Sequence, residues 1–194
     1  QYTDLPIQIN SANTLVKHSS QWSLHSTDGS GFLSAINHSG LSRIESTLIL
    51  GAGGTARAVA QSLDGRSKNI HILSRSTSRQ SSIQNAITKS DFEFLSWSER
   101  VDLTSYDLIV NTTPAGAADL IAEQVQPKPR GLFFDVIYKP WPTVLARKWS
   151  DCGGEVINGL ELLIYQGIDQ LTLALNMEID KEDLARHLRP ILKS

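Results

Sequence analysis

The chain has 194 residues, of which 40% are hydrophobic and 20% charged, and its net charge is −2 at pH 7. This is the composition of a globular protein with a buried core, and the near-zero charge gives no reason to expect nucleic acid or an anionic membrane as a partner. One cysteine, Cys152, excludes an internal disulfide and suits a reducing compartment, and no apolar run approaches the ~20 residues that span a bilayer. We therefore expect a cytoplasmic protein.

The first residues carry little pattern. Gln1 is not an initiator methionine, and residues 1–11 show no helix start or strand alternation. We therefore expect the chain to be a piece of a longer protein. Residues 13–17 and 21–25 then alternate in hydrophobicity and predict a short hairpin. The cluster 26–31 predicts a turn, and the apolar residues of 32–36 predict a helix that leads to the next strand.

The stretch after this helix has the pattern of a dinucleotide-binding turn. A buried strand, 48–50, runs into Gly51-x-Gly53-x-x-Ala56, a helix follows as far as Leu63, and a second strand is expected at 69–73. Gly51 permits the tight turn, Gly53 lets a pyrophosphate approach the backbone, and Ala56 lets the helix pack on the strand. An ordinary strand–helix turn without a ligand is the alternative. The expected cofactor-binding residues of this turn are Gly51, Ala52, Gly53, Gly54, Thr55 and Ala56.

The loop after the second strand indicates which dinucleotide binds. An NAD site normally has Asp or Glu there, to accept hydrogen bonds from the ribose hydroxyls. This chain instead has Ser74, Arg75, Ser76 and, three residues on, Arg79. Arginines pair with a 2′-phosphate, which a carboxylate would repel, so the pattern favours NADP. A solvated polar loop is the alternative interpretation.

The rest of the chain alternates strands and helices. Strands are expected at 91–95, 105–110, 131–136 and 155–157, and helices at 81–89, 144–150 (with Pro142 suited to its first turn), 160–175 and 180–192. The last helix is amphipathic and has Asp180 as its N-cap. Alternating strands and helices predict an α/β fold with a doubly wound parallel sheet of the Rossmann type. Ligands bind at the carboxyl ends of such strands, where the loops 51–56, 74–79, 111–116 and 136–143 meet.

Seven segments, in chain order, match one family. They read NTLV, TDGSGF, LGAGGTARA, SRS, VNTTPAG, DVIYKPWPT and GLELLIYQG. This set resembles the shikimate dehydrogenases, and the 138–143 segment looks like actinobacterial members. The resemblance implies a two-domain oxidoreductase of aromatic amino acid biosynthesis that reduces 3-dehydroshikimate to shikimate with NADPH. It divides the chain into a remnant of the substrate domain (1–30), an NADP-binding domain (31–175) and a C-terminal helix (176–194).

The resemblance also implies roles for individual residues. Asp28 matches the acidic partner of the catalytic dyad, and substrate contacts fall on Asn13, Asp28, Tyr138 and Gln166. Read without the family, Asp28 is a turn residue that caps the next helix, Gln166 a surface glutamine and Tyr138 a packing aromatic. The remaining cofactor contacts implied by the family are Asn111, Thr112, Thr113, Pro114, Val136, Gly159 and Leu163. No metal ligands are expected.

One departure from the family bears on catalysis. The family's catalytic lysine lies upstream of the Asn13 motif, and none of the eight lysines here has a matching context. Asp28, if exposed, should have an ordinary carboxyl pKa and be ionised at neutral pH. We therefore expect the chain to bind NADPH but to be catalytically weak. A non-catalytic NADP-binding regulatory module is the alternative, as is a quinate/shikimate dehydrogenase, although Arg75 argues against an NAD-preferring enzyme. A homodimer is a possible assembly.

Overall fold

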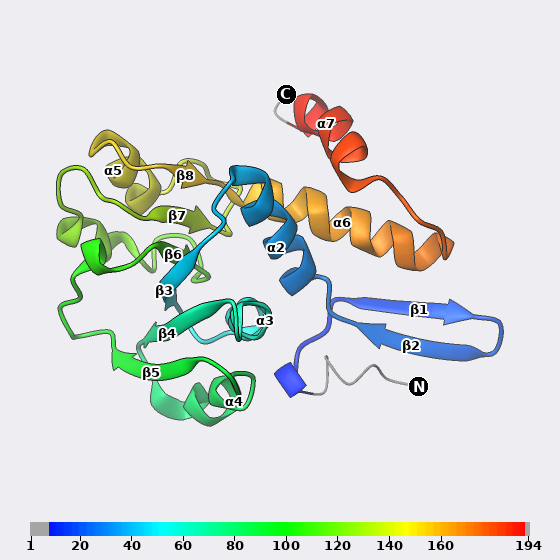
Figure 1. The fold of residues 1–194 in the computed structure, drawn as a ribbon, viewed down its shortest axis with the longest axis horizontal. Helices are drawn as coiled ribbons and strands as arrows, with labels where there is room; N and C mark the ends of the chain where they lie inside the picture. Colours follow the sequence, from blue (N-terminus) through cyan, green and yellow to red (C-terminus); the bar gives the residue numbers. More distant parts are fainter. Residues whose placement is uncertain (1–7, 193–194) are drawn as a thin grey trace.

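Six parallel strands form the centre of the molecule (Figure 1). The computed structural model describes residues 8–192, so the first seven residues of the expected 1–30 segment and the last two of the chain lie outside the described residues. The strand order is β5-β4-β3-β6-β7-β8. This is the order of a doubly wound dinucleotide-binding sheet and confirms the predicted fold class. The strands are β3 (Ile44–Leu50), β4 (Ser67–Ser74), β5 (Asp91–Ser96), β6 (Leu108–Asn111), β7 (Leu132–Asp135) and β8 (Val156–Ile157).

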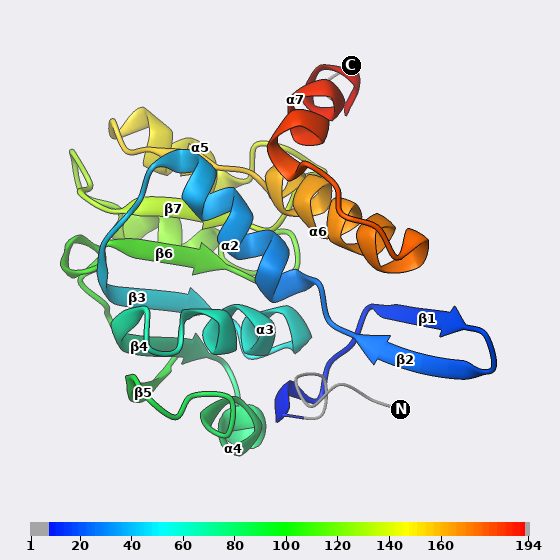
Figure 2. The ribbon, with the colours of Figure 1, turned by 45° about the vertical axis from the view of Figure 1, so that its right-hand side comes forward.

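Both faces of the sheet are covered, so successive residues of an inner strand can be buried on opposite faces, as Leu48, Ile49 and Leu50 of β3 are. Helices α2 (Asp28–Ser39), α3 (Gly54–Leu63) and α6 (Gly159–Leu175) cover one face, where Ile49 of β3 points. Helix α5 (Val144–Asp151) and the short 3-10 segment η3 (Asp119–Gln124) cover the other, where Leu48 and Leu50 point. Figure 2 shows α2 and α3 in front of the sheet.

Helix α2 lies between α3 and α6, and two glycines allow the close approach. A Cβ atom at Gly29 would lie 2.9 Å from the carbonyl oxygen of Ala58, and one at Gly31 would lie 2.7 Å from the backbone nitrogen of Gln166. The prediction of a turn over 26–31 was therefore wrong for residues 28–31, because helix α2 begins at Asp28. The glycines that suggested a turn are contact points between helices.

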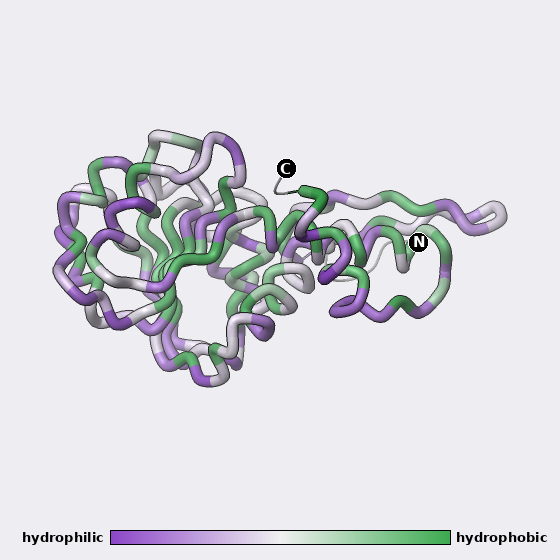
Figure 3. Tube along the Cα trace, turned by 90° about the horizontal axis from the view of Figure 1, so that it is seen from above, coloured by the Kyte–Doolittle hydropathy of each residue, from purple (hydrophilic) through white to green (hydrophobic). Residues whose placement is uncertain are grey.

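The predicted hairpin is confirmed. Strands β1 (Thr14–His18) and β2 (Gln21–His25) pair antiparallel, with Thr14 opposite His25 and His18 opposite Gln21. The hairpin extends away from the six-stranded sheet (Figure 1), and β1 passes near α6. In Figure 3 the hydrophobic stretches run together along the strands of the sheet. The hairpin thus forms a separate small layer next to the main sheet.

Several expected boundaries shift for local reasons. The expected helix 81–89 is the short α4 (Gln80–Gln84), preceded by the 3-10 turn η1 (Thr77–Arg79). Strand β6 begins later than expected because residues Leu103–Ser105 form the 3-10 turn η2, capped by the Asp102 carboxylate, which accepts from the Thr104 N–H at 3.0 Å. Pro142 lies before α5 rather than in its first turn, since Thr143 caps that helix through the Ala146 N–H at 3.1 Å.

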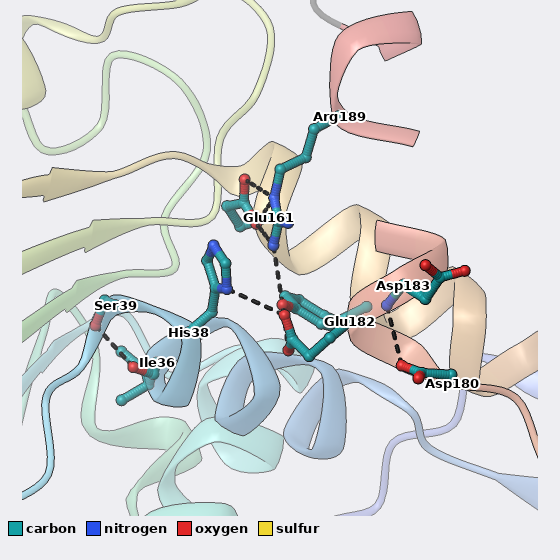
Figure 4. Close-up of polar contacts among 9 residues, drawn as sticks. Ile36, His38, Ser39, Glu161, Asp180, Glu182, Asp183 and Arg189 are labelled. Atoms are coloured by element: carbon teal, nitrogen blue, oxygen red, sulfur yellow. Dashed lines mark hydrogen bonds and ion pairs between the residues drawn. The ribbon is translucent and has the colours of Figure 1, made fainter. Parts of the chain in front are cut away.

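The last helix, α7 (Lys181–Leu192), is fastened by charged groups. The Asp180 carboxylate accepts from the Asp183 N–H at 3.0 Å, which confirms the expected N-cap. At the far end of the helix, Arg189 Nε donates to both carboxylate oxygens of Glu161 on α6 at 3.0 Å (Figure 4). Both side chains of that pair are mostly buried, at 16% and 17% exposure. This pair links the C-terminal helix to α6.

None of the helices within residues 8–192 has the length and hydrophobicity needed to cross a bilayer. In the same part of the chain, no group of three or more His, Cys, Asp or Glu side chains is placed to hold a metal ion.

Candidate functional site

The glycine turn between β3 and α3 has the geometry of a ligand-binding turn. Gly51 has φ +101°, and a Cβ there would lie 2.8 Å from Thr112 Oγ1, so only glycine fits. At Gly53 the nearest atom to a Cβ would be Arg79 Nη1, at 3.8 Å. Gly53 also caps α3 without a side-chain hydrogen bond. The turn therefore leaves backbone and a helix N-terminus open toward a ligand, an arrangement suited to phosphate oxygens.

A cleft of about 430 Å³ opens in front of this turn, at the carboxyl end of the sheet. It brings together the loops after β3, β4 and β6, as the sequence predicted for a cofactor crevice. Two arginines, Arg75 and Arg79, contribute to its wall, and none of the carboxylates within residues 8–192 lines it. The lining residues are Gly51, Ala52, Gly53, Ser74, Arg75, Ser76, Ser78, Arg79, Trp97, Thr112, Thr113 and Pro114.

Two of these residues, Ser78 and Trp97, were not expected from the sequence. Trp97 follows β5 directly, so it stands at the carboxyl end of a strand like the other lining residues. The signal was therefore present in the expected strand 91–95 and in the rule that ligands lie beyond the carboxyl ends of strands. Ser78 lies inside the expected 74–79 loop, where several neighbouring serines carry the same hydroxyl group.

Asn111 does not line the cleft but holds the loop that does. Its side chain is buried, its amide donates to Asp135 Oδ1 at 3.0 Å, and its carbonyl accepts from the Thr113 N–H at 3.1 Å and from the Thr113 hydroxyl at 2.6 Å. Burial raises the pKa of Asp135, although hydrogen bonds from Thr143, Ile137 and Asn111 act in the opposite direction. The buried pair fixes the 111–114 loop, and Thr112, Thr113 and Pro114 face the cleft.

Asp28 occupies the first turn of α2, close to the start of α3. The Asn13 amide donates to Asp28 Oδ1 at 2.7 Å, and the Asn13 carbonyl accepts from the Thr27 N–H at 3.0 Å. Burial raises the pKa of Asp28, while hydrogen bonding by Asn13 and by the Thr55 side chain lowers it. The expectation of a solvent-exposed carboxyl with an ordinary pKa was wrong, because Asp28 is partly buried between Asn13 and the start of α3. Thr55 thus links the glycine turn to Asp28.

The remaining expected residues lie along α6 and the loop after β7. Gln166 packs its backbone against Gly31, one helical turn from Asp28. At the start of α6, a Cβ at Gly159 would lie 2.0 Å from the Val136 carbonyl oxygen, so α6 begins in direct contact with the end of β7. Leu163, one turn further along α6, is half-buried. Tyr138 is 55% exposed and is not among the residues that line the cleft.

No family model matches the chain, but individual proteins do. It is 33% identical over 175 residues to a shikimate dehydrogenase (NADP(+)) of Thermosynechococcus vestitus, covering 85% of the chain and 61% of that protein. A solved shikimate 5-dehydrogenase of Mycobacterium fortuitum is 31% identical, with a TM-score of 0.79 over 96% of this chain and 70% of that one. The chain belongs to the shikimate dehydrogenase family. Mycobacterium tuberculosis shikimate dehydrogenase superposes as well, with a TM-score of 0.85 at 27% identity over 97% of this chain and 71% of that one.

These matches confirm the family that the seven sequence motifs indicated. The chain spans 61–65% of the length of the curated relatives it matches. In this member the glycine turn, the arginine-lined cleft and Asp28 lie at one end of the sheet, joined through the first turn of α3.

Proposed function

We propose that this chain binds NADP(H) in the cleft at the carboxyl end of its sheet, and that it serves the reduction of 3-dehydroshikimate to shikimate. The observation that carries the proposal is the lining of that cleft. A glycine turn open to phosphate lines it together with Arg75 and Arg79, and no carboxylate of residues 8–192 does. The names of the relatives support the same cofactor and substrate.

The residues present fit each part of the cofactor. The backbone of the turn at Gly53 and the N-terminus of α3 would hold the pyrophosphate. Arg75 and Arg79, with the hydroxyls of Ser74 and Ser76, would hold the 2′-phosphate through charge-assisted hydrogen bonds. Bound there, the nicotinamide supplies a hydride. The Asn111–Asp135 pair holds the loop along which the cofactor would lie, and we place Val136, Gly159 and Leu163 on the nicotinamide side.

On the substrate side we assign Asn13, Asp28, Tyr138 and Gln166 to the hydroxyl groups of the substrate. Asn13 orients the Asp28 carboxylate, because its amide donates to Oδ1 at 2.7 Å. Burial raises the pKa of Asp28, and an ammonium group brought next to it would favour the ionised carboxylate and stay protonated itself. Such a pair can deliver a proton to the alkoxide that hydride transfer forms, a contribution of about 10²–10⁴-fold to the rate.

Cofactor preference tests the first part of the proposal. We expect Arg75→Ala to weaken NADP+ binding by ~1.5–3 kcal/mol, or about 10- to 150-fold, since it removes a charged partner of a phosphate. NAD+ binding should change little. Arg147→Ala is the matched control, because Arg147 is exposed on α5, over the other face of the sheet. Isothermal titration with both cofactors measures the difference, and equal NADP+ affinities for wild type and Arg75→Ala would contradict the proposal.

One observation favours a second candidate, an NADP-binding module without catalysis. Within residues 8–192, Asp28 forms no ion pair with a lysine or arginine, and the lysine that pairs with an aspartate on these helices is Lys181, bound to Asp169 at 2.5 Å. Following NADPH absorbance with 3-dehydroshikimate tests this second candidate. With no ammonium beside Asp28, we expect this chain to bind NADPH with negligible turnover, and turnover like that of a two-domain relative would refute the second candidate.

Three expectations from the sequence stay predictions: a cytoplasmic location, a homodimer, and a division into domains at residue 30. Helix α2, which spans Asp28–Ser39, crosses that boundary and packs on the main sheet.

A further inference from the structure

Arg57, on the second turn of α3, binds backbone carbonyls rather than a carboxylate. Its Nε donates to the Ile9 carbonyl oxygen at 2.5 Å, and its Nη2 donates to that of Asn10 at 2.9 Å. Ile9 is buried against Ala58 of α3 and against Ala86. One arginine therefore fastens the segment Ile9–Asn10 to the helix that begins at the glycine turn.

The fastened segment runs directly from the glycine turn to Asp28. Next in the chain, Ser11 Oγ lies 2.7 Å from where a Cβ at Gly54 would stand. Two residues later, Asn13 donates to Asp28 Oδ1 at 2.7 Å and accepts from the Thr27 N–H at 3.0 Å. The five residues from Ile9 to Asn13 thus touch both the turn proposed for the pyrophosphate and the carboxylate proposed for the substrate.

A second arginine flanks the same turn. Arg79 Nη1 lies 3.8 Å from the Cβ position of Gly53, and Arg57 Nη2 lies 4.0 Å from that of Gly54. Neither guanidinium forms a salt bridge with a carboxylate of residues 8–192. Burial lowers the pKa of Arg57, and the charge of Arg79 lowers it further. An anion bound at Arg79 would offset this repulsion and stabilise the charged Arg57 on its two carbonyls.

We propose that Arg57 is a positioning residue that couples occupancy of the cofactor phosphate site at Arg79 to the placement of Asn13 and Asp28, through the segment Ile9–Asn13. The inference rests on the proposed function, since it takes NADP(H) as the ligand of the cleft. By linkage, the coupling is reciprocal: a cofactor that fixes Asn13 favours substrate, and substrate favours the cofactor.

Two backbone amides report on this coupling. The Asn13 N–H donates to the His25 carbonyl at 3.1 Å, and the Thr27 N–H donates to Asn13 Oδ1. Their hydrogen exchange rates can be measured with no ligand, with saturating NADP+ and with saturating NAD+. In the wild type we expect NADP+ to slow both amides about fivefold, the lower end of usual couplings between sites. NAD+, which lacks the 2′-phosphate, should slow them less.

Three variants test the role of Arg57 in this coupling. In Arg57→Gln, which removes the charge, we expect NADP+ to bind while its effect on the two amides disappears. Arg66→Gln is the matched control, because Arg66 is exposed beyond the end of α3, and it should behave like wild type. In Arg79→Gln, the repulsion is absent from the start, so both amides should exchange more slowly than in the unliganded wild type. That third variant tests the coupling even if Arg57→Gln does not fold.

The outcomes separate this inference from the proposed function. If wild type does not bind NADP+, the proposed function fails. If NADP+ binds and slows the two amides equally in wild type and Arg57→Gln, the inference is overturned. Faster exchange in Arg57→Gln by the same factor with and without NADP+ would also overturn it, since that result shows a purely structural role for Arg57.

Discussion

The contact between α2 and α6 offers a sharp test of how the glycines of this chain act. A Cβ at Gly31 would lie 2.7 Å from the backbone nitrogen of Gln166 and 3.0 Å from its Cα and Cβ atoms. These are atoms of a neighbouring helix that cannot rotate away, so Gly31→Ala must push α2 and α6 apart. At Gly167, the next residue on α6, no atom of the part of the chain that the structure describes lies within 4 Å of the Cβ position. The pair of variants therefore separates packing from helix propensity.

Helix propensity and overpacking change the stability of Gly31→Ala with opposite signs and different sizes. Replacing a helical glycine with alanine stabilises a helix by about 1 kcal/mol. Overpacking costs about 1–3 kcal/mol, and three close contacts with rigid atoms place Gly31→Ala near the upper end. We expect Gly31→Ala to be destabilised by about 2 kcal/mol and Gly167→Ala to be stabilised by about 1 kcal/mol. At about 2–4 °C per kcal/mol for a chain of this size, their Tm values should differ by about 6–12 °C.

Urea unfolding followed by circular dichroism gives both free energies of unfolding, and a thermal scan gives the Tm values. A Gly31→Ala variant as stable as Gly167→Ala would refute the close packing of α2 on α6. It would also remove the reason for placing Gln166 one helical turn from Asp28, because that placement depends on the same contact.

Three further predictions concern the cleft and the charged groups. Gly53→Val should abolish NADP+ binding, measured by titration, while circular dichroism shows a folded protein, because its side chain would enter the open space in front of the turn; unchanged affinity would contradict a ligand role. Arg189→Ala should lower the free energy of unfolding by about 1.5–3 kcal/mol, because it removes the mostly buried pair with Glu161. Arg186→Ala, which removes an exposed pair with Asp183, should lower it by under about 1 kcal/mol. Equal losses in urea unfolding would refute the larger contribution of the Arg189–Glu161 pair. Burial alone would raise the pKa of Asp64, but hydrogen bonds from Lys89, Thr88 and Ser90 lower it to about 2. The stability that the ionised Asp64 contributes is therefore complete above the unfolded pKa of 3.8 and is lost as pH falls through about 2. The difference in free energy of unfolding between wild type and Asp64→Asn should shrink over that window, and a difference independent of pH would contradict this role of Asp64.

Much of this protein could be predicted from the sequence because the determining signals are local. The short apolar runs located all six strands of the sheet to within about four residues. The spacing of Gly51, Gly53 and Ala56 located the turn, and the residues that follow the next strand located Arg75 in the cleft. Each of these signals depends on backbone geometry or on periodicity over a few residues, which the neighbouring sequence specifies by itself.

Burial at single polar side chains was decided only by the tertiary structure. Asp28 was expected in solvent, yet it is partly buried beside Asn13 and the start of α3, and the burial of Asn111 against Asp135 had no signal in the neighbouring sequence. Gly29 and Gly31 resembled turn residues, and their role appears only when α3 and α6 pack against them. In each case the partner lies on a different element, up to 135 residues away for Gly31 and Gln166. The pKa of a carboxyl and the space beside a glycine are set by such distant atoms, because desolvation and steric overlap depend on what packs nearby and not on the adjacent sequence.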